Sequence, residues 1–261
     1  MTRTPESLTF ITRHVIQSDA HNLDPKVVPI PWREDLYQSM LLSKKLRIGL
    51  MLDDGVVRVH PPIARLLKWT ATVLERNGHE IIPWKPDLHS EGVAVMDEFY
   101  RADGGVDVRS AIEASGEDYI EHCEKLFGPQ MAANAIDIPS YWRLSVEKRK
   151  IQKAYLDRWN NAGLDILLTP VMPHVGVKHK HTLWVGYTKI WNVLDYTAVV
   201  LPNLGYVSED AIKIHETDCE WKQYKPRNTF DAANWKLCLS PVFLKAAIST
   251  NKLSRRSPRN V

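Results

Sequence analysis

Residues 46–84 have the sequence LRIGLMLDDGVVRVHPPIARLLKWTATVLERNGHEIIPW. The apolar run at 46–51 ends in an Asp-Asp-Gly turn, which predicts a buried strand. Two prolines then open a helix whose apolar residues, from Ile63 to Leu74, recur at helical spacing until an Asn-Gly stop. Residues 79–84 follow as the next strand. Strand, helix and strand in succession are typical of a β-α-β crossover, so we predict an α/β fold with helices packed against a sheet.

The rest of the chain continues this alternation. Thr4 followed by Pro5 predicts a helix start near the N-terminus. Residues 90–163 are predicted to be mostly helical, and two apolar runs, 165–171 and 194–201, are predicted to be buried strands. No internal repeat is visible, and nothing in the sequence argues strongly for a domain boundary.

The amino-acid composition limits the classes of protein to which the chain can belong. With 261 residues, 44% of them hydrophobic, the chain is long enough to bury a substantial core. The net charge of +3, from 34 basic and 31 acidic residues, is too small for a polycationic surface, so no nucleic-acid partner is expected. Cys123, Cys219 and Cys238 form no C-x-x-C pair, which predicts neither a disulfide framework nor a zinc cage. No apolar stretch suits a signal peptide or a membrane span, and we expect a soluble, cytoplasmic protein.

Familiar catalytic and metal-binding motifs are missing. The sequence has no G-x-S-x-G elbow, no Walker loop, no H-E-x-x-H helix and no G-x-G-x-x-G turn. His174, His179 and His181 are candidates for a metal cluster, but no acidic or cysteine ligand stands close by, so core-edge or solvated histidines are favoured. Asp53 and Asp54 could be a pair of cation ligands, but aspartates in a turn before a helix more often form local hydrogen bonds, which is the favoured interpretation. We therefore expect no metal and no cofactor.

One segment, residues 186–196, suits the wall of a ligand pocket. It is rich in aromatic and amide side chains, which offer apolar contact area and a few polar partners for a small molecule. The alternative is that the rings belong to the core and the polar groups cap turns. The predicted substrate-binding residues are Tyr187, Trp191, Asn192, Asp195 and Tyr196.

Several blocks, taken in order, resemble the fungal acetamidase-like branch of the amidase-signature family. The resemblance extends over roughly residues 2 to 230, and its blocks are residues 53–57, 60–62, 78–80, 99–105, 168–171 and 187–196. The resemblance implies an amidase-signature α/β fold, a mixed sheet flanked by helices. It also implies hydrolysis of a carboxamide to an acid and ammonia or an amine, without a cofactor.

The family's catalyst is implied to be a serine nucleophile, a second serine in a cis peptide and a lysine base, with backbone N–H groups around the oxyanion. That machinery lies in the family's N-terminal half. This sequence has no Ser-Ser dipeptide, and its single Gly-Gly pair, Gly104-Gly105, matches a different part of the family. No catalytic residue is therefore carried over, and the chain is expected to begin downstream of its own active site.

The resemblance predicts residues 1–230 as the C-terminal half of an amidase-signature domain, with an incomplete sheet. Residues 231–261 are predicted to be a divergent, basic and partly disordered tail, and Thr197 stands where the family usually has proline. The favoured hypothesis is a chain that is inactive alone and takes a small amide only when a catalytic half is supplied. The alternatives are a binding or regulatory partner that associates through an exposed sheet edge, and an active amidase with an unrelated catalyst.

Overall fold

The structure, a computed structural model, describes residues 2, 4–42, 45–121, 123–124, 128, 135–174, 177, 184–201 and 224–238. These residues belong to two compact units, Met1–Lys45 and Leu46–Val261. No signal in the sequence predicts this division.

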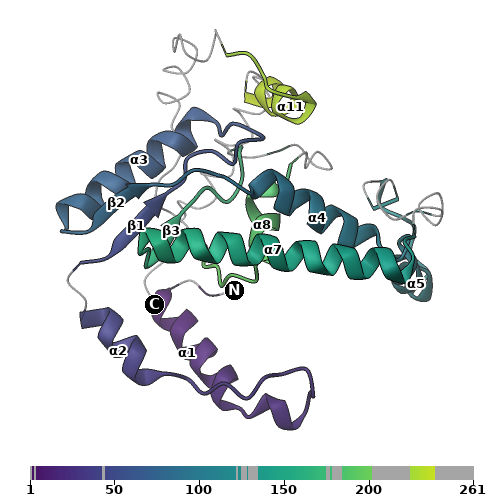
Figure 1. Cartoon of the computed structure of the whole chain (residues 1–261), viewed down its shortest axis with the longest axis horizontal. Coiled ribbons are helices and arrows are strands. Elements are labelled where there is room, and N and C mark those ends of the chain that lie inside the picture. The colour runs from purple at the N-terminus through teal and green to yellow at the C-terminus, as the bar shows by residue number, and fades with distance from the viewer. Residues whose placement is uncertain are drawn as a thin grey trace, which may run out of the picture. The chain divides into compact units, whose positions relative to one another are not determined.

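The first unit is built from short helices. They are α1 (Pro5–Gln17), η1 (Ala20–Asn22) and α2 (Glu34–Leu42), shown in Figure 1. The predicted N-terminal helix start is confirmed, because the Thr4 hydroxyl accepts a hydrogen bond from the Ser7 N–H at 3.2 Å. None of the three helices contains a buried residue.

The second unit is organised around a parallel sheet in the order β2-β1-β3. Its strands are β1 (Arg47–Leu50), β2 (Glu80–Pro83) and β3 (Ile166–Leu168). Helix α3 (Pro61–Arg76) connects β1 to β2, which confirms the predicted crossover. The predicted strand at 165–171 is also present, but it is shorter than expected.

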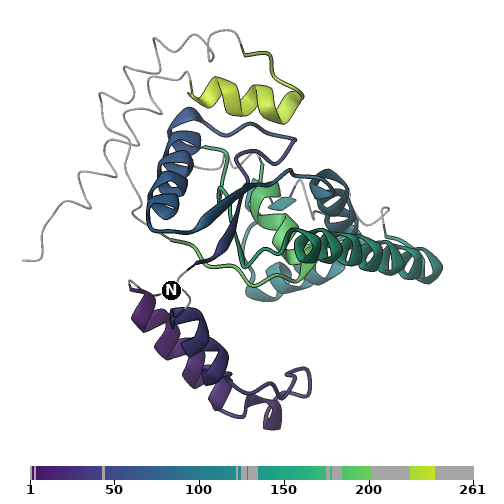
Figure 2. The ribbon, with the colours of Figure 1, turned by 60° about the vertical axis from the view of Figure 1, so that its left-hand side comes forward.

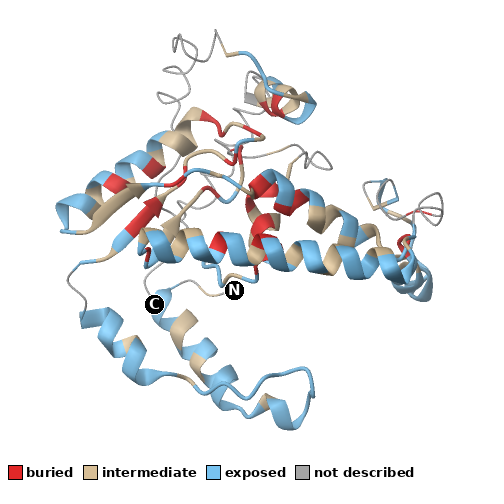
Figure 3. Ribbon diagram, in the orientation of Figure 1, coloured by how far each residue is buried: buried red, intermediate tan, exposed pale blue. Residues whose placement is uncertain are grey.

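Helices cover both sides of this sheet. Figure 2 shows α3 on one side of β1 and the helices α4 (His89–Arg101), α7 (Ile138–Ala162) and α8 (Gly186–Leu194) on the other. A short helix, α5 (Val106–Ser115), follows α4, so the predicted helical region at 90–163 is confirmed where it is described. The buried residues in Figure 3 gather on β1, on α8 and on the parts of α4 and α7 nearest to α8.

Close approach of α4 to α8 depends on one glycine. A Cβ atom at Gly92 would lie 2.6 Å from Ile190 Cδ1 and 3.3 Å from Val193 Cγ1, both of which belong to fully buried side chains. The two helices therefore pack more closely than a larger residue at position 92 would allow.

The prediction of a buried strand at 194–201 is wrong. Leu194 is buried as the last residue of α8, and residues 195–201 contain no strand. Val199, Val200 and Leu201 are 59%, 62% and 55% exposed. An apolar run becomes a strand only where a neighbouring strand pairs with it, and the described residues supply none.

The described part of the predicted tail beyond residue 230 is helical. Residues Thr229–Cys238 form helix α11, and Asp231 and Asn234 within it are buried. Residues 239–261 lie outside the described part of the chain. No helix among the described residues is long and apolar enough to cross a membrane.

Candidate functional site

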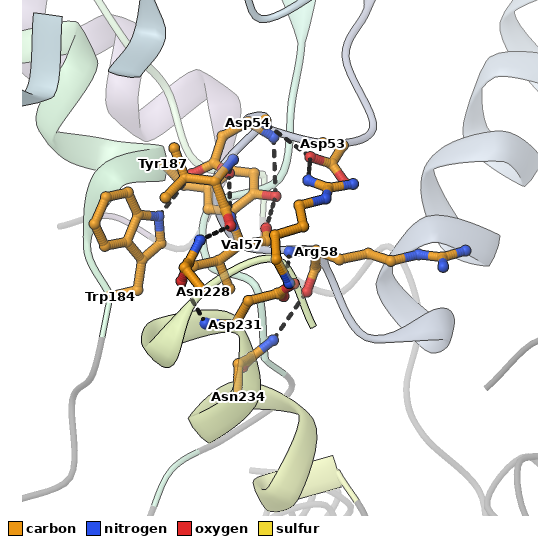
Figure 4. A network of polar contacts seen from close by, with 12 residues as sticks. Asp53, Asp54, Val57, Arg58, Trp184, Tyr187, Asn228, Asp231 and Asn234 are labelled. Atoms are coloured by element: carbon orange, nitrogen blue, oxygen red, sulfur yellow. Dashed lines mark hydrogen bonds and ion pairs between the residues drawn. The ribbon is translucent and has the colours of Figure 1, made fainter. Parts of the chain in front are cut away.

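The loop between β1 and α3 leaves the carboxyl end of the central strand, where parallel α/β sheets usually bind ligands. Asp54 organises this loop, because its buried carboxylate accepts hydrogen bonds from the N–H groups of Val56 and Val57 at 2.9 and 2.8 Å. The same carboxylate accepts the indole N–H of Trp184 at 2.6 Å, as Figure 4 shows. Burial raises the pKa of Asp54, and these three hydrogen bonds act in the opposite direction.

Tyr187, at the start of α8, supports the loop from inside the core. Its hydroxyl donates to the Val57 carbonyl at 2.6 Å and accepts from the Asp54 N–H at 3.1 Å. Burial, reinforced by the nearby charge of Asp54, raises the pKa of this phenol far above its usual value. Tyr187 is therefore a neutral side chain committed to two backbone groups.

Helix α11 holds the other side of the loop. The buried Asp231 carboxylate accepts the Arg58 N–H at 2.9 Å and the Tyr224 hydroxyl, while the Asn234 amide donates to the Arg58 carbonyl at 2.9 Å. Arg227 forms a bidentate ion pair with Asp53, with N–O distances of 2.6 and 2.9 Å (Figure 4). The loop is thus fixed by residues that lie more than 120 positions away in the sequence.

These contacts account for Asp53 and Asp54 without a cation. No group of three potential metal ligands occurs among the residues that the structure describes. His174 is buried, and its burial lowers its pKa, whereas His179 and His181 lie outside the described residues.

A second set of buried side chains lies beyond the end of β2 and is mainly aromatic. Tyr155 of α7 accepts the indole N–H of Trp84 at 3.0 Å, and its hydroxyl lies 3.2 Å from His89 Nε2. Trp191 and Tyr196 pack edge-on against Tyr155, with ring centroids 6.3 and 5.7 Å away. This aromatic cluster, Trp84, His89, Tyr155, Trp159, Trp191 and Tyr196, is part of the main core.

An open hollow of about 380 Å³ lies beside the aromatic cluster. α7 and the end of α8 form its walls, and its lining residues are Gln152, Lys153, Leu156, Leu194, Asp195, Tyr196 and Thr197. Its volume is within the range of small-molecule sites. This hollow is the candidate binding site.

The five predicted substrate-binding residues do not share one surface. Asp195 and Tyr196 line the hollow, and Trp191 lies behind it in the aromatic cluster. Tyr187 is fully buried beneath the β1 loop, and Asn192 is exposed with its amide donating to the Thr188 carbonyl. Tyr187, Trp191 and Asn192 lie on helix α8 and point in different directions, whereas Asp195 and Tyr196 follow the end of the helix.

The described lining of the hollow offers contacts for a ligand but contains no nucleophile with a neighbouring base. Gln152 donates its amide to the Val193 carbonyl at 2.9 Å, and the Lys153 ammonium is paired with Asp157. The remaining polar side chains of the lining are the Asp195 carboxylate, the Tyr196 phenol and the Thr197 hydroxyl. Among the described residues that line the hollow there is no serine, cysteine or histidine. Its chemistry is that of a binding surface with an apolar wall.

Comparison with known proteins places the chain in a family. The model of the family described as Amidase matches residues 1–220. The chain belongs to the amidase family. It is 40% identical over 243 residues to "Amidase 1" of Gibberella moniliformis and 31% identical over 260 residues to "Acetamidase" of Aspergillus oryzae.

This amidase-family chain spans less than half the length of those relatives. The alignments cover 91% and 96% of the chain but 45% and 46% of the two relatives. A solved structure of "Fatty acid amide hydrolase" matches with a TM-score of 0.70 and 22% identity, over 89% of this chain and 40% of that one. The amidase-signature fold expected from the sequence is thereby confirmed, for part of the full architecture.

The contribution of α7 to the hollow was not predicted from the sequence. Gln152, Lys153 and Leu156 lie on a helix with a charged outer face, which resembles an ordinary solvated surface. These residues line the hollow because the end of α8, about forty residues later in the chain, lies next to them in space. A local sequence pattern does not record that proximity. Trp184 and Tyr187, which contact Asp54, and Arg58, which contacts Asp231, are likewise distant in sequence from these aspartates and left no local motif.

Proposed function

We propose that this chain supplies the pocket-lining, carboxy-terminal half of an amide hydrolase and does not cleave amides by itself. The observation that carries the proposal is the amidase match over residues 1–220 in a sequence without a Ser-Ser dipeptide. A cytoplasmic location, inferred from the unpaired cysteine pattern, belongs to the same proposal.

The reaction of an intact enzyme would add water to the amide carbonyl carbon, break the C–N bond and release ammonia or an amine. This chain would hold the acyl part of the substrate against the apolar wall of the hollow, formed by Leu156, Leu194 and Tyr196. Asp195 and Thr197 at its rim would contact the polar end. The names of the relatives, an acetamidase and a fatty acid amide hydrolase, support a carboxamide as the substrate class.

A fluorophosphonate probe tests whether the chain contains an activated serine. Such probes phosphonylate a serine hydroxyl only where a neighbouring base activates it. We expect no labelling of the purified chain above the level of heat-denatured protein, while "Amidase 1" treated in parallel provides the positive control. Stoichiometric labelling of a serine in the folded chain would refute the proposal.

A further inference from the structure

The residues that end helix α8 form a fixed corner of the hollow. The N–H groups of Asp195 and Tyr196 both donate to the Trp191 carbonyl, the second of them at 3.1 Å. Asp195 has a φ of 60°, in the left-handed region that aspartate and asparagine adopt more readily than most other residues. The backbone therefore fixes the positions from which these two side chains reach the hollow.

The Asp195 carboxylate is the one charged group of the described lining that has no partner. Lys153, the other charged lining residue, is held by both carboxylate oxygens of Asp157, with N–O distances of 2.5 and 2.6 Å. No residue in the described part of the chain forms a hydrogen bond or an ion pair with the exposed Asp195 side chain. The described lining thus presents an unbalanced negative charge at its rim.

The other lining groups suit an apolar ligand better than an anionic one. Gln152 already donates its amide to the Val193 carbonyl at 2.9 Å. The Tyr196 hydroxyl is buried, so the side-chain atoms that Tyr196 offers to the hollow are carbons. Together with Leu156 and Leu194, these carbons form an apolar wall. An apolar body that carries a positive charge therefore matches both the wall and the rim.

We propose that the hollow selects carboxamides that carry a protonated amino group on an apolar body. The ammonium group would contact the Asp195 carboxylate, and the body would lie against Leu156, Leu194 and the ring of Tyr196. A neutral amide would leave the carboxylate without a partner, and an anionic amide would be repelled by it. This inference rests on the proposed function and narrows its substrate class.

Three probes of one shape test the charge preference. At pH 7, 4-(aminomethyl)benzamide is a cation, 4-(hydroxymethyl)benzamide is neutral and 4-carboxybenzamide is an anion. Their dissociation constants for the purified chain are measured by ligand-observed NMR titration. We expect the cation to bind about three- to fivefold more tightly than the neutral amide, because Asp195 is exposed to solvent, and the anion to bind most weakly. Salt at about 1 M should reduce the preference, since the Debye length falls to about 3 Å.

Asp195→Asn is the decisive variant, because asparagine tolerates the same left-handed backbone and lacks the charge. It should lower the affinity for the cation to about that for the neutral amide. Glu117→Gln, at an exposed carboxylate outside the described lining, removes the same charge and is the matched control. This control should keep the preference for the cation. Circular dichroism checks that each variant is folded.

The possible outcomes separate this inference from the proposed function. Equal binding of the three probes, tighter binding of the anion, or no binding of any probe would overturn the inference. So would a preference for the cation that survives Asp195→Asn or is unchanged at high salt. Labelling of the chain by the fluorophosphonate probe refutes the proposed function whatever the hollow binds. A chain that is not labelled and does not discriminate between the charges overturns this inference alone.

Discussion

His89 is the buried titratable side chain at the centre of the aromatic cluster. It is 1% exposed, and burial lowers its pKa to about 4, with the charge of Arg158 adding to the effect. Its Nδ1 atom has no hydrogen-bond partner among the described residues. The folded protein therefore keeps His89 neutral at pH 7, whereas the unfolded chain binds a proton there near pH 6.5.

The free energy of unfolding should consequently fall as the pH is lowered from 7 towards 4. A pKa that is depressed on folding means that the unfolded state binds more protons in this window, so acid favours unfolding. Between pH 7 and pH 5 we expect the protonation of His89 to lower the free energy of unfolding by about 2 kcal/mol, measured by urea denaturation.

His89→Gln provides the control for this prediction. The variant removes the titration but leaves an amide that can still bond Tyr155. Burial also lowers the pKa of His174, so the relevant quantity is the difference in pH dependence between the two proteins. Identical pH profiles would show that His89 does not carry the effect.

Asp231 is the residue on which the attachment of α11 depends most. It is 1% exposed and accepts hydrogen bonds from two backbone N–H groups, those of Arg58 and Arg227. Asp231→Ala should lower the free energy of unfolding by about 1 to 3 kcal/mol, because it removes the acceptor of these two N–H groups and of the Tyr224 hydroxyl. Lys236→Ala, at an exposed position of the same helix, should change it by about 0.5 kcal/mol or less. Equal urea midpoints for the two variants would contradict the assigned role.

Among the secondary-structure elements, helices α4 and α8 pack closely against each other at Gly92. Gly92→Ala should lower the free energy of unfolding by about 1 to 3 kcal/mol, since its Cβ would meet Ile190 Cδ1 inside the core. Adding Ile190→Val removes that methyl group, and the double variant should regain part of the loss in a thermal or urea unfolding experiment. If the two substitutions are simply additive, the steric explanation fails.

The same scale explains what could be predicted from the sequence. The β1-α3-β2 crossover was predictable because its signals, an apolar run, two prolines and an Asn-Gly stop, are all local. The segment 194–201 has the composition of a strand, but a strand also needs a neighbour, and none is described here. The prediction therefore failed where the deciding contact is non-local.

The candidate site shows the same limit. Asp195 and Tyr196 were predicted as ligand contacts and do line the hollow, but Tyr187 belongs to the support of the β1 loop. The opposite wall, from Gln152 to Leu156, carries no motif of its own. Whether these residues contact an amide stays a prediction.

For the whole molecule, exposed apolar surface should dominate the behaviour of the isolated chain. We expect the purified protein to be polydisperse at raised concentration, because Val199 and Val200 are more than half exposed and no strand in the described part of the chain pairs with the second side of β3. Val199→Asp with Val200→Asp should raise the monomer fraction in light scattering, while Val146→Asp should not. A wild-type monomer with a sharp, cooperative melt would contradict this expectation and favour an independent domain.

The chain has an amidase-family fold, and we propose that its hollow contacts a carboxamide while the chain alone does not cleave it. Ammonia release from acetamide and from longer and aromatic carboxamides, measured with the purified chain alone, tests this claim most directly. The account predicts a rate equal to that of the buffer blank for every amide. A rate that is proportional to the concentration of the chain, persists through successive purification steps and is lost in Asp195→Ala would contradict it.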